Sequence, residues 1–100
     1  MKTKDKHHLD IYIKLISRFI DKEIDAATFE SQFLSIRRND NYWMSGSFDM
    51  EVAQILDTLF LDIDEYASDD LYEVDDKYNI DEKELRRRVN NAKNKLQQLE

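Results

Sequence analysis

The segment from Phe48 to Ala67 repeats apolar residues at steps of three and four positions. This spacing places the apolar side chains on one face of a helix, because an α-helix has about 3.6 residues per turn. At about 1.5 Å per residue the helix would be about 30 Å long. Its apolar face has to be covered by other parts of the chain, so the segment requires a fold in which helices pack together.

Three further segments have the spacing of amphipathic helices. They are residues 9–23, 26–36 and 85–99. Asp25 is expected to be the N-cap of the second helix and Ser47 that of the third, while Asp81 and Glu84 resemble a capping box before the fourth. One glycine and no proline in 100 residues argue against an all-β fold, which needs frequent turn residues. We therefore predict an all-α fold, an antiparallel four-helix bundle.

A chain of this length predicts one domain over residues 1–100, with residues 1–8 as a frayed N-terminus. The last helix has a narrow apolar seam that is suited to lengthwise packing, so the chain is expected to be a monomer or a weak homodimer.

On the surface of this last helix, Glu82 with Arg86 and Glu84 with Arg88 are spaced as favourable ion pairs. The arginine run is therefore interpreted as a charged helix face and not as a phosphate site.

The sequence lacks the usual signals of an enzyme. It contains no cysteine, no glycine-rich phosphate loop and no nucleophile elbow. We expect no catalysis, no cofactor and no metal site. A calcium loop is a weak alternative: Asp62, Asp64, Asp70 and Glu73 match its ligand spacing, but Ala67 occupies the position that needs glycine.

The hydropathy of the sequence bears on the cellular location of the protein. No apolar run approaches the roughly 18 residues of a membrane span, and the first ten residues lack the apolar centre of a signal peptide. Together with the absence of cysteine, this predicts a cytoplasmic protein with no membrane partner.

The strongest functional signal is the stretch "LDIDEYASDDLYEVDD", residues 61–76, which holds eight carboxylates and neither lysine nor arginine. Residues 62–84 contain eleven acids against Lys77 and Lys83, whereas the whole chain has a net charge of −7. The rest of the chain is therefore slightly positive. Such an acidic region repels nucleic acid and attracts basic protein surfaces, although a charge run can also be a solvated face that maintains solubility.

Helical geometry suggests how this region meets a partner. Leu61 and Glu65 point nearly opposite to the apolar stripe, so Leu61 is expected to be an exposed anchor beside acids, with Tyr72 as another. Isolated surface leucines are also common and need not bind anything. The predicted partner-binding residues are Leu61, Asp62, Asp64, Glu65, Asp69, Asp70, Tyr72, Glu73, Asp75 and Asp76.

Three sequence segments, "LISRFIDKEIDAATFESQFLSI", "LDTLFLDIDEYASDD" and "YNIDEKELRRRV", resemble the colicin-D-like bacterial immunity proteins in order and spacing. The similarity runs from roughly Leu15 to Val89. It implies a small helical protein that binds the nuclease domain of its own bacteriocin or contact-dependent growth inhibition toxin, often a tRNase. It also implies inhibition by acidic side chains that fill the toxin's basic RNA-binding cleft. By position, Asp62 and Asp64 match the family's acids at the end of the third helix, whereas residues 69–76 lie in a connection that varies within the family.

A second hypothesis is an acidic interaction module of another class, such as a DNA mimic that occupies a different basic partner. The identity of the partner and the role of the loop at residues 39–47 stay open at this point.

Overall fold

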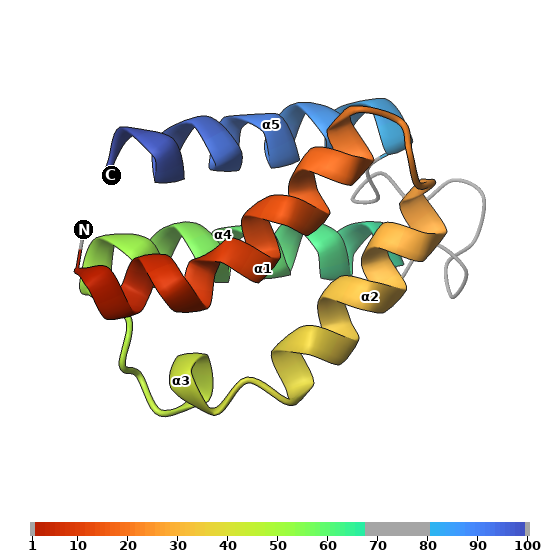
Figure 1. Cartoon of the computed structure of the whole chain (residues 1–100). Coiled ribbons are helices and arrows are strands. Elements are labelled where there is room, and N and C mark those ends of the chain that lie inside the picture. The colour runs from red at the N-terminus through yellow and green to blue at the C-terminus, as the bar shows by residue number, and fades with distance from the viewer. Residues whose placement is uncertain (1, 68–80, 100) are drawn as a thin grey trace.

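The computed structural model describes residues 2–67 and 81–99 of the chain. In these residues all regular structure is helical and forms five helices. Figure 1 shows their arrangement. They are α1 (Thr3–Ile20), α2 (Ala26–Arg38), α3 (Asn41–Met44), α4 (Met50–Ala67) and α5 (Glu82–Gln98). The prediction of an all-α fold is confirmed.

The four long helices pack around one core, and α3 is a single turn that follows α2. Helices α4 and α5 lie side by side and run in opposite directions (Figure 1). Helix α1 crosses this pair obliquely and contacts both α5 and α2, while α2 contacts α4. The antiparallel arrangement therefore holds for α4 and α5, whereas the oblique course of α1 departs from the regular bundle that the sequence predicted.

Aromatic side chains from three helices fill the centre of the core. Phe19 of α1 and Phe29 of α2 stack with their ring centroids 4.5 Å apart. Trp43 of α3 lies edge-on to Tyr12 and Phe33, at centroid distances of 5.4 and 6.0 Å. Such edge-to-face and stacked arrangements add to the stabilisation from burial alone. The short helix α3 thus belongs to the core because it carries Trp43.

Helix α5 supplies the aliphatic side of the core. Leu85, Val89, Ala92 and Leu96 are buried, and α5 contacts both α1 and α4. The narrow seam that we considered as a surface for a second copy is therefore used inside the chain.

The predicted helix caps agree with the structure at two of three positions. The Asp25 side chain accepts a hydrogen bond from the backbone of Thr28, and Asp81 accepts one from the backbone of Glu84, each at 2.8 Å. Each bond satisfies one of the backbone N–H groups that are left without partners at a helix start.

Ser47 was predicted as the cap of the third long helix, and that prediction is wrong. Helix α4 begins at Met50, and the Ser47 hydroxyl shares a hydrogen bond of 2.7 Å with the Ser45 hydroxyl. Gly46 lies between these serines with φ of +75°, a backbone conformation that glycine adopts without strain. The chain turns there, after α3, and enters α4 later than expected.

The amino-terminal residues differ from the predicted frayed end, because α1 begins at Thr3. Asp5, in its first turn, is completely buried. Its carboxylate accepts hydrogen bonds from the Tyr42 hydroxyl at 2.5 Å and from the Asp49 backbone at 2.9 Å. The Lys2 ammonium lies 3.9 Å from the same carboxylate. Asp5 therefore joins the start of α1 to α3 and to the entry of α4.

The environment of Asp5 determines its ionisation. Burial opposes the charged form, but the bonds from Tyr42 and Asp49 outweigh it, so the pKa of Asp5 is lowered. Because the pKa of Asp5 is lower in the folded than in the unfolded protein, the ionised carboxylate stabilises the fold at pH values above its unfolded-state pKa of about 3.9. This contribution is lost as pH falls through the folded-state pKa.

We predict that Asp5→Ala lowers the free energy of unfolding by about 2 kcal/mol, because it leaves the Tyr42 hydroxyl and the Asp49 backbone N–H without their buried acceptor. Urea denaturation of both proteins at pH 7 measures the loss. Asp10→Ala is the matched control, since Asp10 is an exposed acid of the same helix. The difference between wild type and Asp5→Ala should shrink as pH falls from about 4, the unfolded-state pKa of the carboxyl, toward its lower folded-state pKa. Equal stability of all three proteins at pH 7 would contradict this account.

Candidate functional site

Helix α4 presents an acidic outer face. Its sequence contains five carboxylates and no lysine or arginine. Leu61 is 63% exposed and points away from the core, opposite to the buried Ile63. Asp64 is also exposed, and it forms no ion pair with another residue of the described ranges. The outward position that the sequence predicted for Leu61 is therefore observed.

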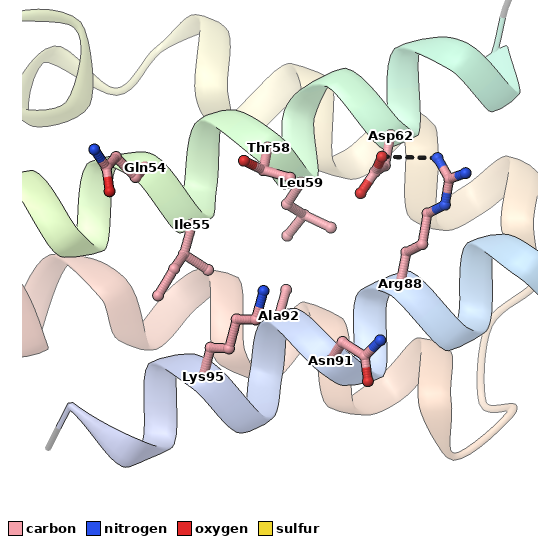
Figure 2. Close-up of a pocket in the computed structure, with 9 residues that line it drawn as sticks. All are labelled: Gln54, Ile55, Thr58, Leu59, Asp62, Arg88, Asn91, Ala92 and Lys95. Atoms are coloured by element: carbon pink, nitrogen blue, oxygen red, sulfur yellow. Dashed lines mark hydrogen bonds and ion pairs between the residues drawn. The ribbon is translucent and has the colours of Figure 1, made fainter.

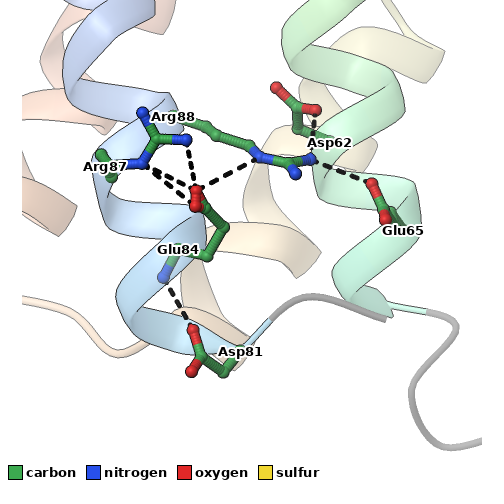
Figure 3. A network of polar contacts seen from close by, with 6 residues as sticks. All are labelled: Asp62, Glu65, Asp81, Glu84, Arg87 and Arg88. Atoms are coloured by element: carbon green, nitrogen blue, oxygen red, sulfur yellow. Dashed lines mark hydrogen bonds and ion pairs between the residues drawn. The ribbon is translucent and has the colours of Figure 1, made fainter. Parts of the chain in front are cut away.

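Two of the predicted acids are engaged by a cation from another helix. Arg88 of α5 donates through one terminal nitrogen to Asp62 at 2.9 Å and to Glu65 at 3.0 Å, as Figure 3 shows. The side chains of Asp62 and Glu65 are 18% and 34% exposed. Glu65, which helical geometry placed nearly opposite to the core, turns toward Arg88 and is partly buried.

Both ion pairs that the sequence predicted within α5 are present. Arg86 lies 3.4 Å from Glu82, and the Arg88 Nε lies 3.8 Å from Glu84. Glu84 also pairs with Arg87, at 2.5 Å. A terminal nitrogen of Arg88 reaches across to α4 at the same time (Figure 3). The sequence offers only a general signal for that contact, since α4 has five acids and no cation of its own.

Burial and charge act in opposite directions on Asp62. Burial raises the pKa of this carboxyl, and Arg88 offsets that effect only in part, so the pKa stays above its ordinary value. The nearby Glu65 and Glu84 carboxylates act in the same direction as burial. Asp62 is therefore a carboxylate whose charge is tolerated because Arg88 is present.

The Asp62–Arg88 pair also closes one end of a groove between α4 and α5 (Figure 2). Its volume is about 330 Å³. Ile55, Leu59 and Ala92 lie in it, together with polar side chains from both helices. The groove and the acidic end of α4 thus meet at one ion pair.

The other predicted partner-binding residues lie outside the described residues. They are Asp69, Asp70, Tyr72, Glu73, Asp75 and Asp76. The calcium alternative depends partly on the same segment. Within residues 2–67 and 81–99, no three His, Cys, Asp or Glu side chains are grouped so that they could hold a metal ion. Nor is any helix in these ranges long and apolar enough to cross a membrane.

Comparison of the sequence with protein-family profiles identifies a family. Residues 8–96 match the profile of the family described as bacterial self-protective colicin-like immunity. The chain belongs to this immunity family. No curated protein and no solved structure matches the chain. The resemblance seen in the sequence is confirmed, and the match includes both the outer face of α4 and Arg88 of α5.

Membership implies a protective role against a colicin-type toxin and a protein partner. The immunity protein is accordingly expected to act by binding that partner. The exposed Leu61, the open Asp64 and the groove beside Asp62 are the features that the described residues offer for such binding.

We predict that Arg88→Gln destabilises the immunity protein by about 1–2 kcal/mol, because Asp62 and Glu65 lose their shared cation. The arginine side chain is 29% exposed, so water screens part of the loss. Arg87→Gln is the matched control: Arg87 is 65% exposed and pairs within its own helix, so its removal should have little effect. Chemical denaturation at pH 7 measures the loss of stability in each variant. Equal losses for Arg88→Gln and Arg87→Gln would refute the prediction.

Asp62→Asn tests the cost of ionising a half-buried acid. The pKa of Asp62 is higher in the folded than in the unfolded protein. The protein therefore loses stability as pH rises from the unfolded-state pKa to the folded-state pKa of this carboxyl. We expect Asp62→Asn to be at least as stable as wild type at pH 7, with the two becoming similar below about pH 4. Melting temperatures measured between pH 3 and pH 7 give the comparison. A large loss of stability at pH 7 would show that the Asp62–Arg88 attraction outweighs burial.

Proposed function

We propose that this immunity protein binds and neutralises the nuclease domain of a cognate toxin, a tRNase bacteriocin or a contact-dependent growth inhibition toxin. The acidic end of α4 would cover the basic cleft in which the toxin binds RNA. The observation that carries this proposal is the exposed Leu61 beside Asp64, on a helix that has five acids and no cation of its own.

Charge supports this choice of partner. One Arg88 guanidinium is shared by Asp62 and Glu65, so the group keeps a negative charge, and Asp64 adds another beside it. A nuclease must present lysine and arginine to RNA phosphates. Carboxylates complement those cations, speed the encounter and exclude the RNA from the same surface.

Leu61 supplies the apolar part of the contact. Interfaces are commonly stabilised by a few apolar anchors that are surrounded by polar groups which exclude water. A leucine that is 63% exposed and lies between carboxylates has this arrangement. The sequence from Asp69 to Asp76 holds five more carboxylates, which we include in the proposed contact.

The proposed mechanism is occlusion, without chemistry on the toxin. The immunity protein would act in the cytoplasm, where the toxin meets its RNA substrate, and would need no cofactor. Its four packed helices present the acidic surface on a rigid element, which lowers the entropic cost of binding.

The test is expression of this protein with the toxin domain encoded beside its gene, followed by co-purification and tRNA cleavage assays from low to high salt. A complex that silences cleavage, and whose association slows as salt rises, supports nuclease inhibition by charge. A complex with a toxin that does not cleave RNA would refute the nuclease assignment. Silencing with a salt-independent association rate would refute the electrostatic mechanism.

We predict that Asp64→Lys slows association with the toxin about tenfold at low salt, and less at high salt, because it reverses a charge at the contact. Asp21→Lys changes the net charge equally at an exposed position at the end of α1, and serves as the control. Stopped-flow or interferometry measurements give both rates. Equal slowing by the two substitutions would show a general effect of net charge.

Leu61→Ala should instead raise the dissociation rate about tenfold, because removal of an apolar anchor acts after the encounter. Met44→Ala is the control, since Met44 is similarly exposed, at 64%, but lies on α3. Unchanged dissociation for Leu61→Ala would remove Leu61 from the proposed interface.

A further inference from the structure

The groove between α4 and α5 has a floor and rims of different chemistry. Ile55 and Leu59 of α4 and Ala92 of α5 supply apolar surface, while Gln54 and Asn91 stand on opposite sides (Figure 2). An apolar surface with a few polar groups around it is the usual composition of a binding site. The volume of about 330 Å³ can hold a side chain with its adjoining main chain.

The polar side chains of the groove have unused hydrogen-bonding capacity. Gln54, Thr58 and Asn91 form no side-chain hydrogen bond, and Lys95 forms no ion pair, with any residue in the described ranges 2–67 and 81–99. The nearby Asp62 and Arg88 are, in contrast, bonded to each other. In the groove, amide, hydroxyl and ammonium groups that have no partner in the described ranges therefore lie around apolar surface.

The charges at the two ends of the groove differ. One end is closed by the Asp62–Arg88 pair, next to the acidic end of α4, and Lys95 stands toward the other end (Figure 2). Lys95 lies in the last turn of α5, where a cation is also favoured by the helix dipole. A ligand that fits both the apolar floor and Lys95 has an apolar group and an anion.

We propose that this groove is a second docking site for the toxin, and that it receives an extended toxin segment with an apolar side chain next to an acidic one. The apolar side chain would lie on Leu59 and Ala92, and the acidic side chain would pair with Lys95. Gln54 and Asn91 would hydrogen-bond the main chain of the segment, because an amide group can both donate and accept. This inference rests on the proposed function, since it assigns a second contact to the same partner.

A second site of opposite charge would fix the orientation of the complex. The acidic end of α4 selects a basic surface, whereas Lys95 selects an acidic side chain. A toxin that satisfies both ends can bind in only one direction along α4, and one that satisfies a single end binds more weakly. The groove would thus separate the cognate toxin from other basic nucleases.

The experiment measures dissociation rates of complexes between the toxin domain encoded beside the gene and two matched pairs of variants. Lys95→Glu is compared with Lys93→Glu, which makes the same charge change in α5 outside the groove lining. Asn91→Trp, which fills the groove, is compared with Asn94→Trp at another exposed asparagine of α5. Circular dichroism melting verifies that all four variants are folded.

We expect Lys95→Glu and Asn91→Trp each to raise the dissociation rate about tenfold or more, with less than about a twofold change for the two controls. Side-chain amide signals of Gln54 and Asn91 in nitrogen-15 spectra should also shift when the wild-type protein binds the toxin. Equal rates in each pair, or unmoved amide signals, would overturn the inference.

The outcomes separate this inference from the proposed function. If Asp64→Lys weakens binding while the groove variants bind like their controls, the acidic surface stands and the groove site is refuted. If the groove variants alone weaken binding, the groove site stands and occlusion by the acidic end of α4 is refuted. A wild-type protein that does not bind the toxin would overturn both.

Discussion

The charge balance between α4 and α5 is the constraint on which the acidic surface depends. Asp62, Asp64 and Glu65 lie within one helical turn and repel one another, and α4 has no cation to offset them. Arg88 relieves this repulsion from α5 and, by holding two of the three carboxylates, ties the end of α4 to its neighbour. Leu61 points outward from the same end of α4.

The features that the sequence predicted correctly are local ones. Apolar periodicity predicted the four long helices and the outward position of Leu61, and the caps at Asp25 and Asp81 depend on residues only three positions away. The missed features are contacts between distant parts of the chain. Asp5 binds Tyr42, and Arg88 binds Glu65, and no periodic signal connects such positions. Ser47 failed as a cap because the chain turns at Gly46 before α4 begins.

The surface that results has two kinds of chemistry beside each other. An acidic helix face with one exposed leucine borders a groove whose far end carries Lys95. Inhibition by charge alone would suit any nuclease with a basic cleft, but an immunity protein must recognise its own toxin. A neighbouring site of opposite charge, on the rigid α4–α5 pair, offers a physical basis for that discrimination.

The buried carboxylate of Asp5 has a practical consequence for handling the protein. The Asp5 carboxylate accepts hydrogen bonds from the Tyr42 hydroxyl and the Asp49 backbone, so the first turn of α1 fixes the connection between α2 and α4. A chain trimmed to begin at Lys6 would lose this shared acceptor, so the Tyr42 hydroxyl and the Asp49 backbone N–H would no longer be held to α1.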